Sequence, residues 1–257
     1  MKYIKDLSSE VTIEHNAELG IILEKSYTIE LAYDYLNNID DVKDLEKVLN
    51  PIWGEYILYF TYKSKKYVVL SAKGASIAAN AVERIRRTGG KALVSIGTCG
   101  STDESIEDGT FLVVSGAIRN EGVTKGYLDL KVPCTSDSEL SLSLTNALKK
   151  SVKTINGYIF TTDNRYQEDP VELKFLTQHA KVVAVDMETS AILLISMYHN
   201  IKASTIKIIT DCAVKETDGE LKGIFDRNKD FVEFVHPKLK IAIQVALNVL
   251  AGSEDNV

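Results

Sequence analysis

The sequence predicts an α/β fold, a three-layer α/β/α sandwich around a mixed, largely parallel central sheet. Short apolar runs rich in β-branched residues alternate along the chain with longer amphipathic segments, as in parallel sheets that helices cover on both faces. A length of 257 residues suits one large domain, and the four prolines mark no obvious linker between smaller ones. We therefore expect residues 1–257 to form a single domain.

The first elements follow from their turns and caps. Residues 56–62 and 66–71 predict a hairpin, because a polar turn, Lys63-Ser64-Lys65, separates two apolar and aromatic runs. Residues 76–88 predict a helix that ends at Gly89-Gly90, since glycine commonly follows a helix C-terminus.

The later segments continue the alternation. Leu140, Leu144 and Leu148 recur at the i, i+4 spacing that is typical of a helix. The expected helices cover residues 138–151, 191–197 and 237–250, and the expected strands cover 92–96, 110–117, 158–161, 181–185 and 204–210.

The composition argues against several classes of protein. A net charge of -6 does not suit a nucleic-acid surface, which would carry a basic stripe. The three cysteines, Cys99, Cys134 and Cys212, are too scattered for a disulfide framework or a zinc site and indicate a reducing compartment. No apolar run approaches the roughly 20 residues of a membrane span, and the first residues do not read as a signal peptide. We expect a cytoplasmic protein that binds neither membranes nor nucleic acid.

The most informative stretch, Val185 to Ala191, lies where an apolar strand gives way to an apolar helix. It carries two carboxylates, Asp186 and Glu188, with Met187 between them. Ligands in an open α/β sheet bind at the C-terminal ends of the strands, so a small-molecule site is expected here. An ordinary helix start gives the same pattern, because the helix dipole favours acids in the first turn.

Three further strand ends carry candidate residues. The backbone amides of Gly97 to Gly100 and the Thr98 hydroxyl can approach an anion or a sugar, although glycines here are also common in plain turns. Phe160 can stack on a planar base or simply belong to the core. Asp211 can hold a proton near neutrality if the site shields it from water, or it can cap a turn.

Six short motifs follow one another in register. They are Gly74-Ala75-Ser76, Ile96 to Gly100, Ala117 to Gly122, Phe160 to Asp163, Asp186 to Glu188, and Thr210-Asp211. Their order and spacing resemble those of the nucleoside phosphorylase/uridine phosphorylase superfamily, over roughly Thr12 to Val214. The resemblance implies a three-layer sandwich, a small-molecule nucleoside as substrate, and a homo-oligomer, either a dimer or a hexamer. It implies no metal or organic cofactor, and inorganic phosphate as co-substrate.

The resemblance also implies roles for individual residues. Glu188 would bind the ribose 2′- and 3′-hydroxyls, with Met187 packed beneath the sugar, and Phe160 would stack on the base. Asp211 would protonate a purine at N7 as the glycosidic bond breaks, because a purine anion is a poor leaving group.

Three residues have less defined roles in this resemblance. Thr98 and Gly100 would line the phosphate or ribose face. His15 is similar to a family histidine that reaches the ribose 5′-hydroxyl in a neighbouring subunit, although an exposed surface histidine is the simpler interpretation.

The departures from the family pattern all concern phosphate. The loop Leu23 to Thr28 has neither the glycine nor the arginine of the family loop, Ser95 replaces a second arginine, and a third would fall near Trp53. Lys25 can supply charge, but a lysine is not the planar fork that clamps an oxyanion.

The reaction therefore stays open between phosphorolysis and hydrolysis. Glu24 can activate water in a hydrolytic nucleosidase, although a lone glutamate in a surface loop is usually solvated. Phosphorolysis, which releases the base and ribose 1-phosphate, is favoured because the motifs from Ala117 and from Phe160 look more like those of the phosphorylases. A non-catalytic nucleoside-binding relative is the third hypothesis, and the retained Asp211 and Glu188 argue against it.

The choice of base also stays open. Asp211 favours a purine, because a pyrimidine has no N7 to receive its proton. In uridine phosphorylases a glutamine and an arginine read the uracil edge. Gln167 matches the glutamine, Asp169 stands where the arginine is expected, and the nearby Arg165 can compensate.

Overall fold

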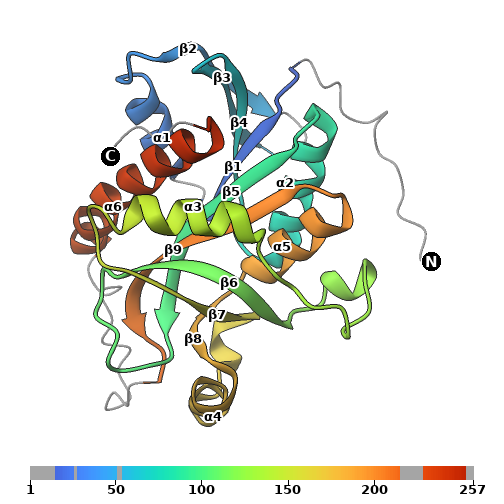
Figure 1. Ribbon diagram of the computed structural model, residues 1–257, viewed down its shortest axis with the longest axis vertical. Coiled ribbons are helices and arrows are strands. Elements are labelled where there is room, and N and C mark those ends of the chain that lie inside the picture. The colour runs from blue at the N-terminus through green and yellow to red at the C-terminus, as the bar shows by residue number, and fades with distance from the viewer. Residues whose placement is uncertain (1–14, 26–27, 51–53, 215–227, 253–257) are drawn as a thin grey trace.

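The computed structural model describes residues 15–25, 28–50, 54–214 and 228–252 (Figure 1). Trp53 lies outside them. The strands are β1 (Leu19–Leu23), β2 (Val42–Asn50), β3 (Glu55–Tyr62), β4 (Lys65–Ser71), β5 (Ala92–Ser101), β6 (Phe111–Asn120), β7 (Thr154–Thr162), β8 (Val182–Asp186) and β9 (Lys202–Cys212). The helices are α1 (Thr28–Leu36), α2 (Ala75–Thr88), α3 (Ser138–Leu148), α4 (Pro170–Ala180), α5 (Thr189–Tyr198) and α6 (Asn228–Leu250).

The strands form one mixed sheet in the order β2-β3-β4-β1-β5-β8-β7-β6-β9. A further pairing of β5 with β9 closes the last five strands into a ring. The pairs β1–β4, β1–β5, β5–β9, β6–β7 and β7–β8 are parallel, whereas β2–β3, β3–β4, β5–β8 and β6–β9 are antiparallel. The expected mixed, largely parallel central sheet is confirmed.

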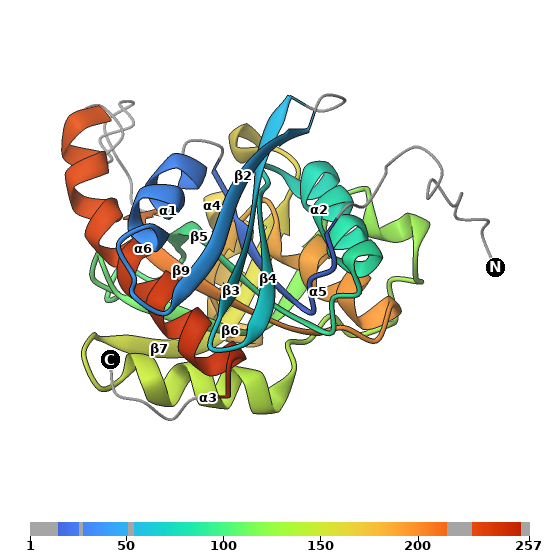
Figure 2. The same cartoon turned by 90° about the horizontal axis from the view of Figure 1, so that it is seen from above.

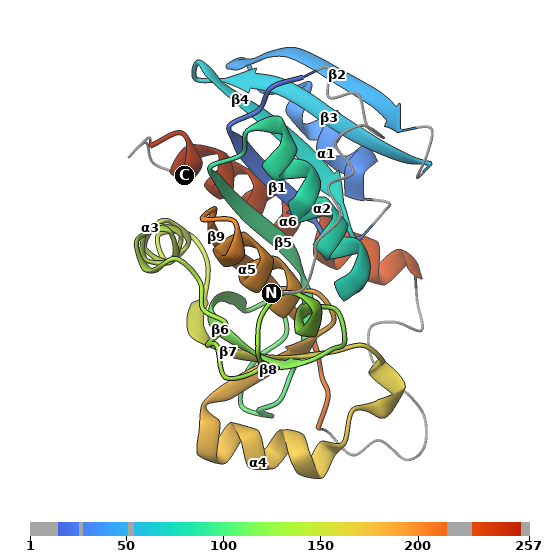
Figure 3. The same cartoon turned by 90° about the vertical axis from the view of Figure 1, so that its right-hand side faces the viewer.

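Helices cover both faces of the sheet (Figure 2). On one face α2 and α5 pack on the sheet through residues such as Ala78, Ile85 and Ile192, and on the other α1, α3 and α6 bury a second cluster that includes Leu36 and Leu144. The expected three-layer sandwich is therefore confirmed. Helix α4 lies apart from both layers, beside β8 (Figure 3). Within the described ranges, no helix combines the length and apolar character that a membrane crossing requires.

Most expected elements occur close to their expected bounds. The 56–71 hairpin is β3 and β4, and its turn residues Lys63 and Ser64 adopt φ values of 47° and 63°, the left-handed region of tight hairpin turns. Helix α2 ends at Gly89, whose φ of 96° allows its N–H to bond back to Arg86 O and Ile85 O.

Three expectations about elements were wrong or incomplete. Helix α6 begins at Asn228, well before its expected start at Pro237, which lies inside the helix. The strand expected to stop at Ile96 continues as β5 to Ser101, because Gly97 to Cys99 pair in parallel register with Lys207 to Ile209 of β9. The elements β1, α1, β2 and α4 were not expected. Strand β1 is a buried apolar run, LGIIL, too short for its periodicity to distinguish a strand from a helix segment, and β2 is an edge strand with exposed charged residues.

Candidate functional site

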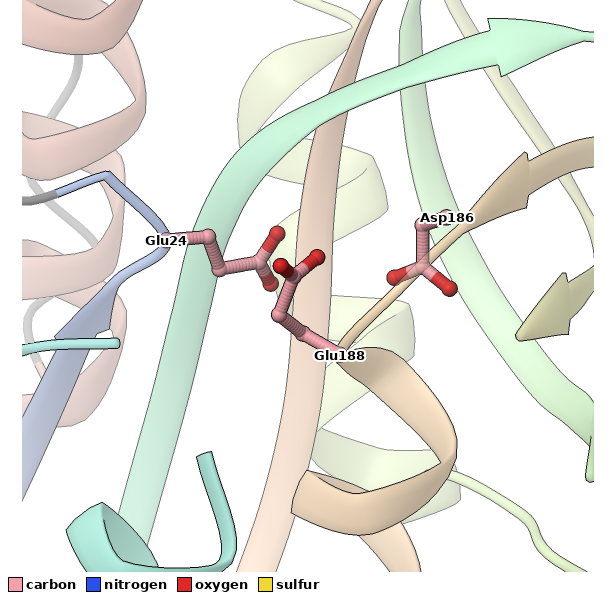
Figure 4. A group of neighbouring side chains, drawn as sticks. All are labelled: Glu24, Asp186 and Glu188. Atoms are coloured by element: carbon pink, nitrogen blue, oxygen red, sulfur yellow. The ribbon is translucent and has the colours of Figure 1, made fainter. Parts of the chain in front are cut away.

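Three carboxylic acids meet where β1 and β8 end (Figure 4). Glu24 directly follows β1, Asp186 is the last residue of β8, and Glu188 directly precedes α5. The Glu24 and Glu188 side chains extend toward one another, and Asp186 approaches from the other side of the group. All three are less than a tenth exposed, so Glu24 does not behave as a solvated loop residue.

A buried lysine joins two of these acids. Lys207 alternates with Ile206 and Ile208 of β9, whose side chains enter the core beneath α6, so its own side chain points to the opposite face of the sheet. Its ammonium is fully buried, lies 2.6 Å from Asp186 Oδ2 and forms an ion pair with Glu24 Oε2. A buried ammonium is tolerated only when it is paired and hydrogen-bonded, as it is here.

Strand β5 completes the surroundings of Glu24. The Ser95 hydroxyl donates to Glu24 Oε1 over 2.5 Å, and Ser95 is fully buried. Gly97, two residues further along the strand, leaves the space that the Glu24 carboxylate fills. Ser95, where the resemblance expects a family arginine, is therefore the partner of a protein carboxylate.

Asp186 links this group to the start of α5. Its Oδ2 accepts from the Thr189 backbone N–H at 2.9 Å and from the Thr189 hydroxyl at 2.5 Å, and its Oδ1 accepts from Thr161 Oγ1 at 2.7 Å. Asp186 thus accepts from the first backbone N–H of α5, but neither it nor Glu188 lies in the first turn of that helix, as the ordinary interpretation expected. The same carboxylate also binds Lys207, so it serves both the fold and the site.

The ion pairs set the protonation of the group. Burial would raise the pKa of Asp186, but the Lys207 ammonium and the donors Thr189 and Thr161 outweigh it and hold that pKa below its ordinary value. Burial raises the pKa of Glu24 in spite of Lys207, and the Asp186 charge adds to the rise. Asp186 is therefore the more firmly ionised partner of Lys207.

Glu188 is held by backbone donors. Its Oε1 accepts from the Gly74 N–H at 2.7 Å and its Oε2 from the Met187 N–H at 3.3 Å. Burial, and then the neighbouring Glu24, raise the pKa of Glu188 to about 8. Glu188 is consequently largely protonated at pH 7 in the absence of a ligand.

The three acids also have the composition of a cation site. Single carboxylate oxygens of Glu24, Asp186 and Glu188 lie within 4.8 Å of one another. The Lys207 ammonium already contacts two of the three, so a protein group fills the position that a bound cation would take. The arrangement fits an internal ammonium rather than a metal ion.

Asp211 lies near the end of β9 and has two donors. Arg165 Nη2 donates to its Oδ2 at 3.1 Å, and Thr210 Oγ1 donates to its Oδ1 at 3.1 Å. Gly100 pairs with Asp211 on β9 and with Val185 on β8, and its missing side chain leaves space beside the Asp211 carboxylate.

Lys25 is a cation whose charge interacts with both Glu188 and Asp211. It is half-buried, and burial lowers its pKa to about 8 although the Glu188 and Asp211 carboxylates act against the fall. One side chain is thus within electrostatic range of both acids on which the sequence interpretation depends.

The remaining candidates are placed as follows. Phe160 is 4% exposed and packs with Leu173 and Val185 in the cluster beneath α4, which favours a core role with at most one edge toward a ligand. Thr98 and Met187 are half-buried, Thr98 on β5 and Met187 between Asp186 and Glu188. Gln167 is exposed on a 3-10 turn.

His15 lies with residues of the outer strands. Its ring stacks on Tyr59 with centroids 4.3 Å apart, and its Nε2 is 3.5 Å from Glu46 Oε2. These contacts place it against the β2–β3 hairpin rather than in the group around Glu188.

Sequence reasoning missed Lys207 and Glu168, and it singled out Gly97 for its backbone amide rather than for its packing. A signal for Lys207 was present, because a single lysine interrupts the apolar run of residues 204–210 and a charge in a buried strand requires a partner. Glu168 is half-buried beside Arg165, and its burial raises its pKa to about 7. No pattern in the sequence indicated that close packing would require a glycine at position 97.

The sequence and the fold of the chain are similar to those of known proteins. The sequence profile described as "Phosphorylase superfamily" matches residues 39–251. The DeoD-type purine nucleoside phosphorylase of Caldanaerobacter subterraneus is 28% identical over 207 residues, which cover 78% of this chain and 84% of that protein.

Two solved structures share the fold. Uridine phosphorylase from Vibrio fischeri superposes with a TM-score of 0.76 at 19% identity, over 93% of this chain and 94% of that one. The 5′-methylthioadenosine/S-adenosyl homocysteine nucleosidase of Campylobacter jejuni superposes with a TM-score of 0.73 at 17% identity, over 92% of this chain and 100% of that one.

Proposed function

Because the chain belongs to the Phosphorylase superfamily, we propose that it is an enzyme that cleaves the N-glycosidic bond of a purine nucleoside, with water accepting the ribosyl group. One observation favours water over phosphate as the acceptor of the ribosyl group. The Glu24 carboxylate is buried beside Glu188, accepts a hydrogen bond from the Ser95 hydroxyl and forms an ion pair with the Lys207 ammonium. These are the groups that would otherwise be offered to an inorganic anion.

The local charge supports this choice. Lys207 is shared between two carboxylates, and a third carboxyl group, Glu188, lies beside them. A phosphate dianion placed here would be repelled by the Asp186 and Glu24 charges, which a single ammonium does not balance, whereas a water molecule is neutral. A carboxylate whose pKa is raised by burial is also a better base than a solvated one.

The chemistry follows from these positions. Glu188, once ionised, accepts hydrogen bonds from the ribose 2′- and 3′-hydroxyls and orients the sugar. As the bond between C1′ and the base nitrogen breaks, its electrons pass to the base, and positive charge develops on the sugar ring. Glu24 takes a proton from the attacking water, whose oxygen bonds to C1′. A carboxyl group at the base end supplies the proton that the leaving base requires, a role that the family resemblance gives to Asp211.

Phosphorolysis is the second candidate. The similarity to purine nucleoside phosphorylases over most of the chain favours it, and Lys25 is a cation within range of Glu188. The same similarity is the reason for preferring a purine to uridine as the base.

The test is to incubate the protein with inosine, adenosine, guanosine and uridine, each with and without inorganic phosphate, and to identify the sugar product. We expect free ribose at a rate that phosphate does not change, and at least 100-fold slower release by Glu24→Gln. Ribose 1-phosphate formed only with phosphate would establish the second candidate instead. Binding of a nucleoside without release of any base would support the non-catalytic hypothesis.

We also propose that the chain forms a homo-oligomer. This rests on the family resemblance and on His15, which the resemblance assigns to a neighbouring subunit's site and which contacts Tyr59 and Glu46 of the β2–β3 hairpin. Sedimentation equilibrium should give a dimer or a hexamer. His15→Ala should raise KM for nucleosides without altering the assembly, and a monomer with full activity would exclude the role.

A further inference from the structure

The buried ammonium of Lys207 has no step in the proposed cleavage. A lysine is almost never fully buried unless it is paired, and the Lys207 ammonium has two partners. It lies 2.6 Å from Asp186 Oδ2 and forms an ion pair with Glu24 Oε2. Buried ion pairs contribute little net stability compared with apolar residues of the same volume, so stability alone does not account for this lysine.

The sheet places Lys207 directly beside Glu24. Lys207 on β9 pairs in parallel register with Gly97 on β5. The Glu24 carboxylate fills the space that the missing side chain of Gly97 leaves. Glu24 therefore lies over the β5–β9 pair, within reach of the Lys207 ammonium.

Two donors hold the Glu24 carboxylate, one at each oxygen. The Ser95 hydroxyl donates to Oε1 over 2.5 Å, and the Lys207 ammonium contacts Oε2. Contacts at both oxygens fix the plane of the carboxylate as well as its position. Each carboxylate oxygen has two lone pairs, so a contacted oxygen can still accept a proton from water.

Lys207 is also connected to the acid that would bind the sugar. Asp186 Oδ2, which contacts Lys207, accepts from the Thr189 N–H at 2.9 Å. Thr189 is the first residue of α5 and directly follows Glu188. One ammonium thus joins the segment that carries Glu24 to the segment that carries Glu188.

The charged and titratable groups that interact with Lys207 come from four elements. They are Glu24 after β1, Asp186 on β8, Glu188 before α5 and Cys99 on β5. Burial would lower the pKa of Lys207, but the Asp186 charge and then the Glu24 charge outweigh it and hold that pKa above its ordinary value. Burial raises the pKa of the Cys99 thiol well above its ordinary value, so the thiol is uncharged. Lys207 therefore stays an ammonium while Glu24 titrates.

We infer that Lys207 is a positioning residue whose ammonium aims the Glu24 carboxylate at the attacking water and fixes its place relative to Glu188. The inference deepens the proposed hydrolysis and rests on it. As the water oxygen bonds to C1′, the water proton passes to Glu24, and the electrons of the glycosidic bond pass to the base. Lys207 gives up no proton in this step. Its second partner, Asp186, keeps the ammonium paired after Glu24 has become neutral.

The experiment compares D186N with the double variant D186N/K207M, so that the two proteins differ only in the ammonium. The double variant loses one positive and one negative charge, which leaves no unpaired Asp186 carboxylate in the core. The asparagine oxygen can still accept from the Thr189 N–H. K202M/E139Q is the matched control, because it removes an exposed ion pair of 2.9 Å that also involves β9.

The measurement is kcat for base release at saturating purine nucleoside between pH 5 and 9, on the order of one pH unit per step. At pH 7 we expect D186N/K207M to have a kcat at least about tenfold below that of D186N, with KM within about threefold, because Lys207 contacts Glu24 and not the nucleoside. K202M/E139Q should match the wild type in both.

The pH profile distinguishes positioning from a merely structural role. Burial raises the pKa of Glu24 and the Lys207 charge opposes the rise, so this pKa should rise further without the ammonium. Glu24 accepts a proton only when it is ionised, and the acid limb of kcat should therefore move upward by about 1–3 pH units from D186N to D186N/K207M. Activity that recovers in the double variant as pH rises would itself demonstrate that the variant is folded.

The other outcomes overturn the assignment. An equal loss of kcat at every pH, or a double variant that is inactive or unfolded throughout, would give Lys207 a structural role only. An unchanged kcat and acid limb would give it no role in the reaction. If the wild-type protein releases no base from any nucleoside, the proposed function itself fails. Release by the wild type with an unmoved acid limb in the double variant would refute only the role of Lys207.

Discussion

The Glu24 carboxylate lies directly against the backbone of Gly97 on the neighbouring strand. A β-carbon at position 97 would overlap Glu24 Oε2 and Cδ, and it would also crowd the Glu24 Cβ. Ser95, two residues earlier on the same face of β5, donates to the other carboxylate oxygen. The acid at position 24 and the missing side chain at position 97 are therefore complementary, and a change at either position should act through the other.

Gly97→Ala should displace Glu24 and abolish most of the cleavage activity. We expect kcat/KM to fall about 100-fold and the free energy of unfolding to fall by about 1–3 kcal/mol, the usual cost of overpacking. Enzyme assays and urea denaturation measure the two effects. Gly126→Ala is the control, because no atom lies within 4 Å of a β-carbon there. Full activity in Gly97→Ala would show that the position of Glu24 does not matter.

Lys207→Met should be strongly destabilising, because it leaves Asp186 and Glu24 buried without their cation. We expect a loss of about 3–5 kcal/mol in the free energy of unfolding by chemical denaturation. Lys202→Met on the same strand removes an exposed, solvent-screened ion pair with Glu139 and should leave the free energy of unfolding nearly unchanged. Adding Asp186→Asn to Lys207→Met should recover part of the loss, and no recovery would contradict the pairing.

Glu188→Gln should stabilise the ligand-free protein at alkaline pH. The pKa of Glu188 is raised from 4.5 to about 8, so between these values the folded state keeps a proton that the unfolded state has lost. The free energy of unfolding of the native protein should therefore decline as pH rises from about 4.5 to about 8.

The glutamine variant has no such charge to bury. It should be more stable than the native protein by about 1–3 kcal/mol at pH 9, with little difference at pH 4. Denaturation at both pH values tests this prediction. A variant that is less stable than the native protein at pH 9 would contradict the raised pKa of Glu188.

Nucleoside binding should release a proton and strengthen as pH rises toward 8. Glu188 accepts from two ribose hydroxyls only when it is ionised, and its pKa without ligand is about 8. Calorimetry with an uncleavable, carbon-linked nucleoside analogue, in buffers with different heats of ionisation, measures the proton directly.

Lys25 loses its charge over the same pH range, since its pKa is also about 8, so Lys25→Met is the necessary control. Proton release that persists in Lys25→Met and vanishes in Glu188→Gln would confirm the assignment. Proton release that vanishes in Lys25→Met and persists in Glu188→Gln would show that Lys25 is the source of the proton.

Much of the fold was predictable because it depends on local patterns. The hairpin turn at Lys63 and Ser64 and the glycine that ends α2 follow from residue preferences over a few positions, and α5 was predicted to within two residues of its start at Thr189. The extent of β5 was not predictable, since it continues through Gly97 to Ser101 only because β9 pairs with it.

The sequence by itself determined the α/β class, the family and the acids at the ends of the strands, because periodicity and short motifs are properties of neighbouring residues. The tertiary structure alone decided which of these acids carry partners. Lys207 is 183 residues from Glu24 along the chain, yet their charges meet inside the fold. Arg165 is 46 residues from Asp211 along the chain, and its guanidinium donates a hydrogen bond to the Asp211 carboxylate. Protonation depends on burial and on charges within a few ångströms, and only the folded chain sets those distances.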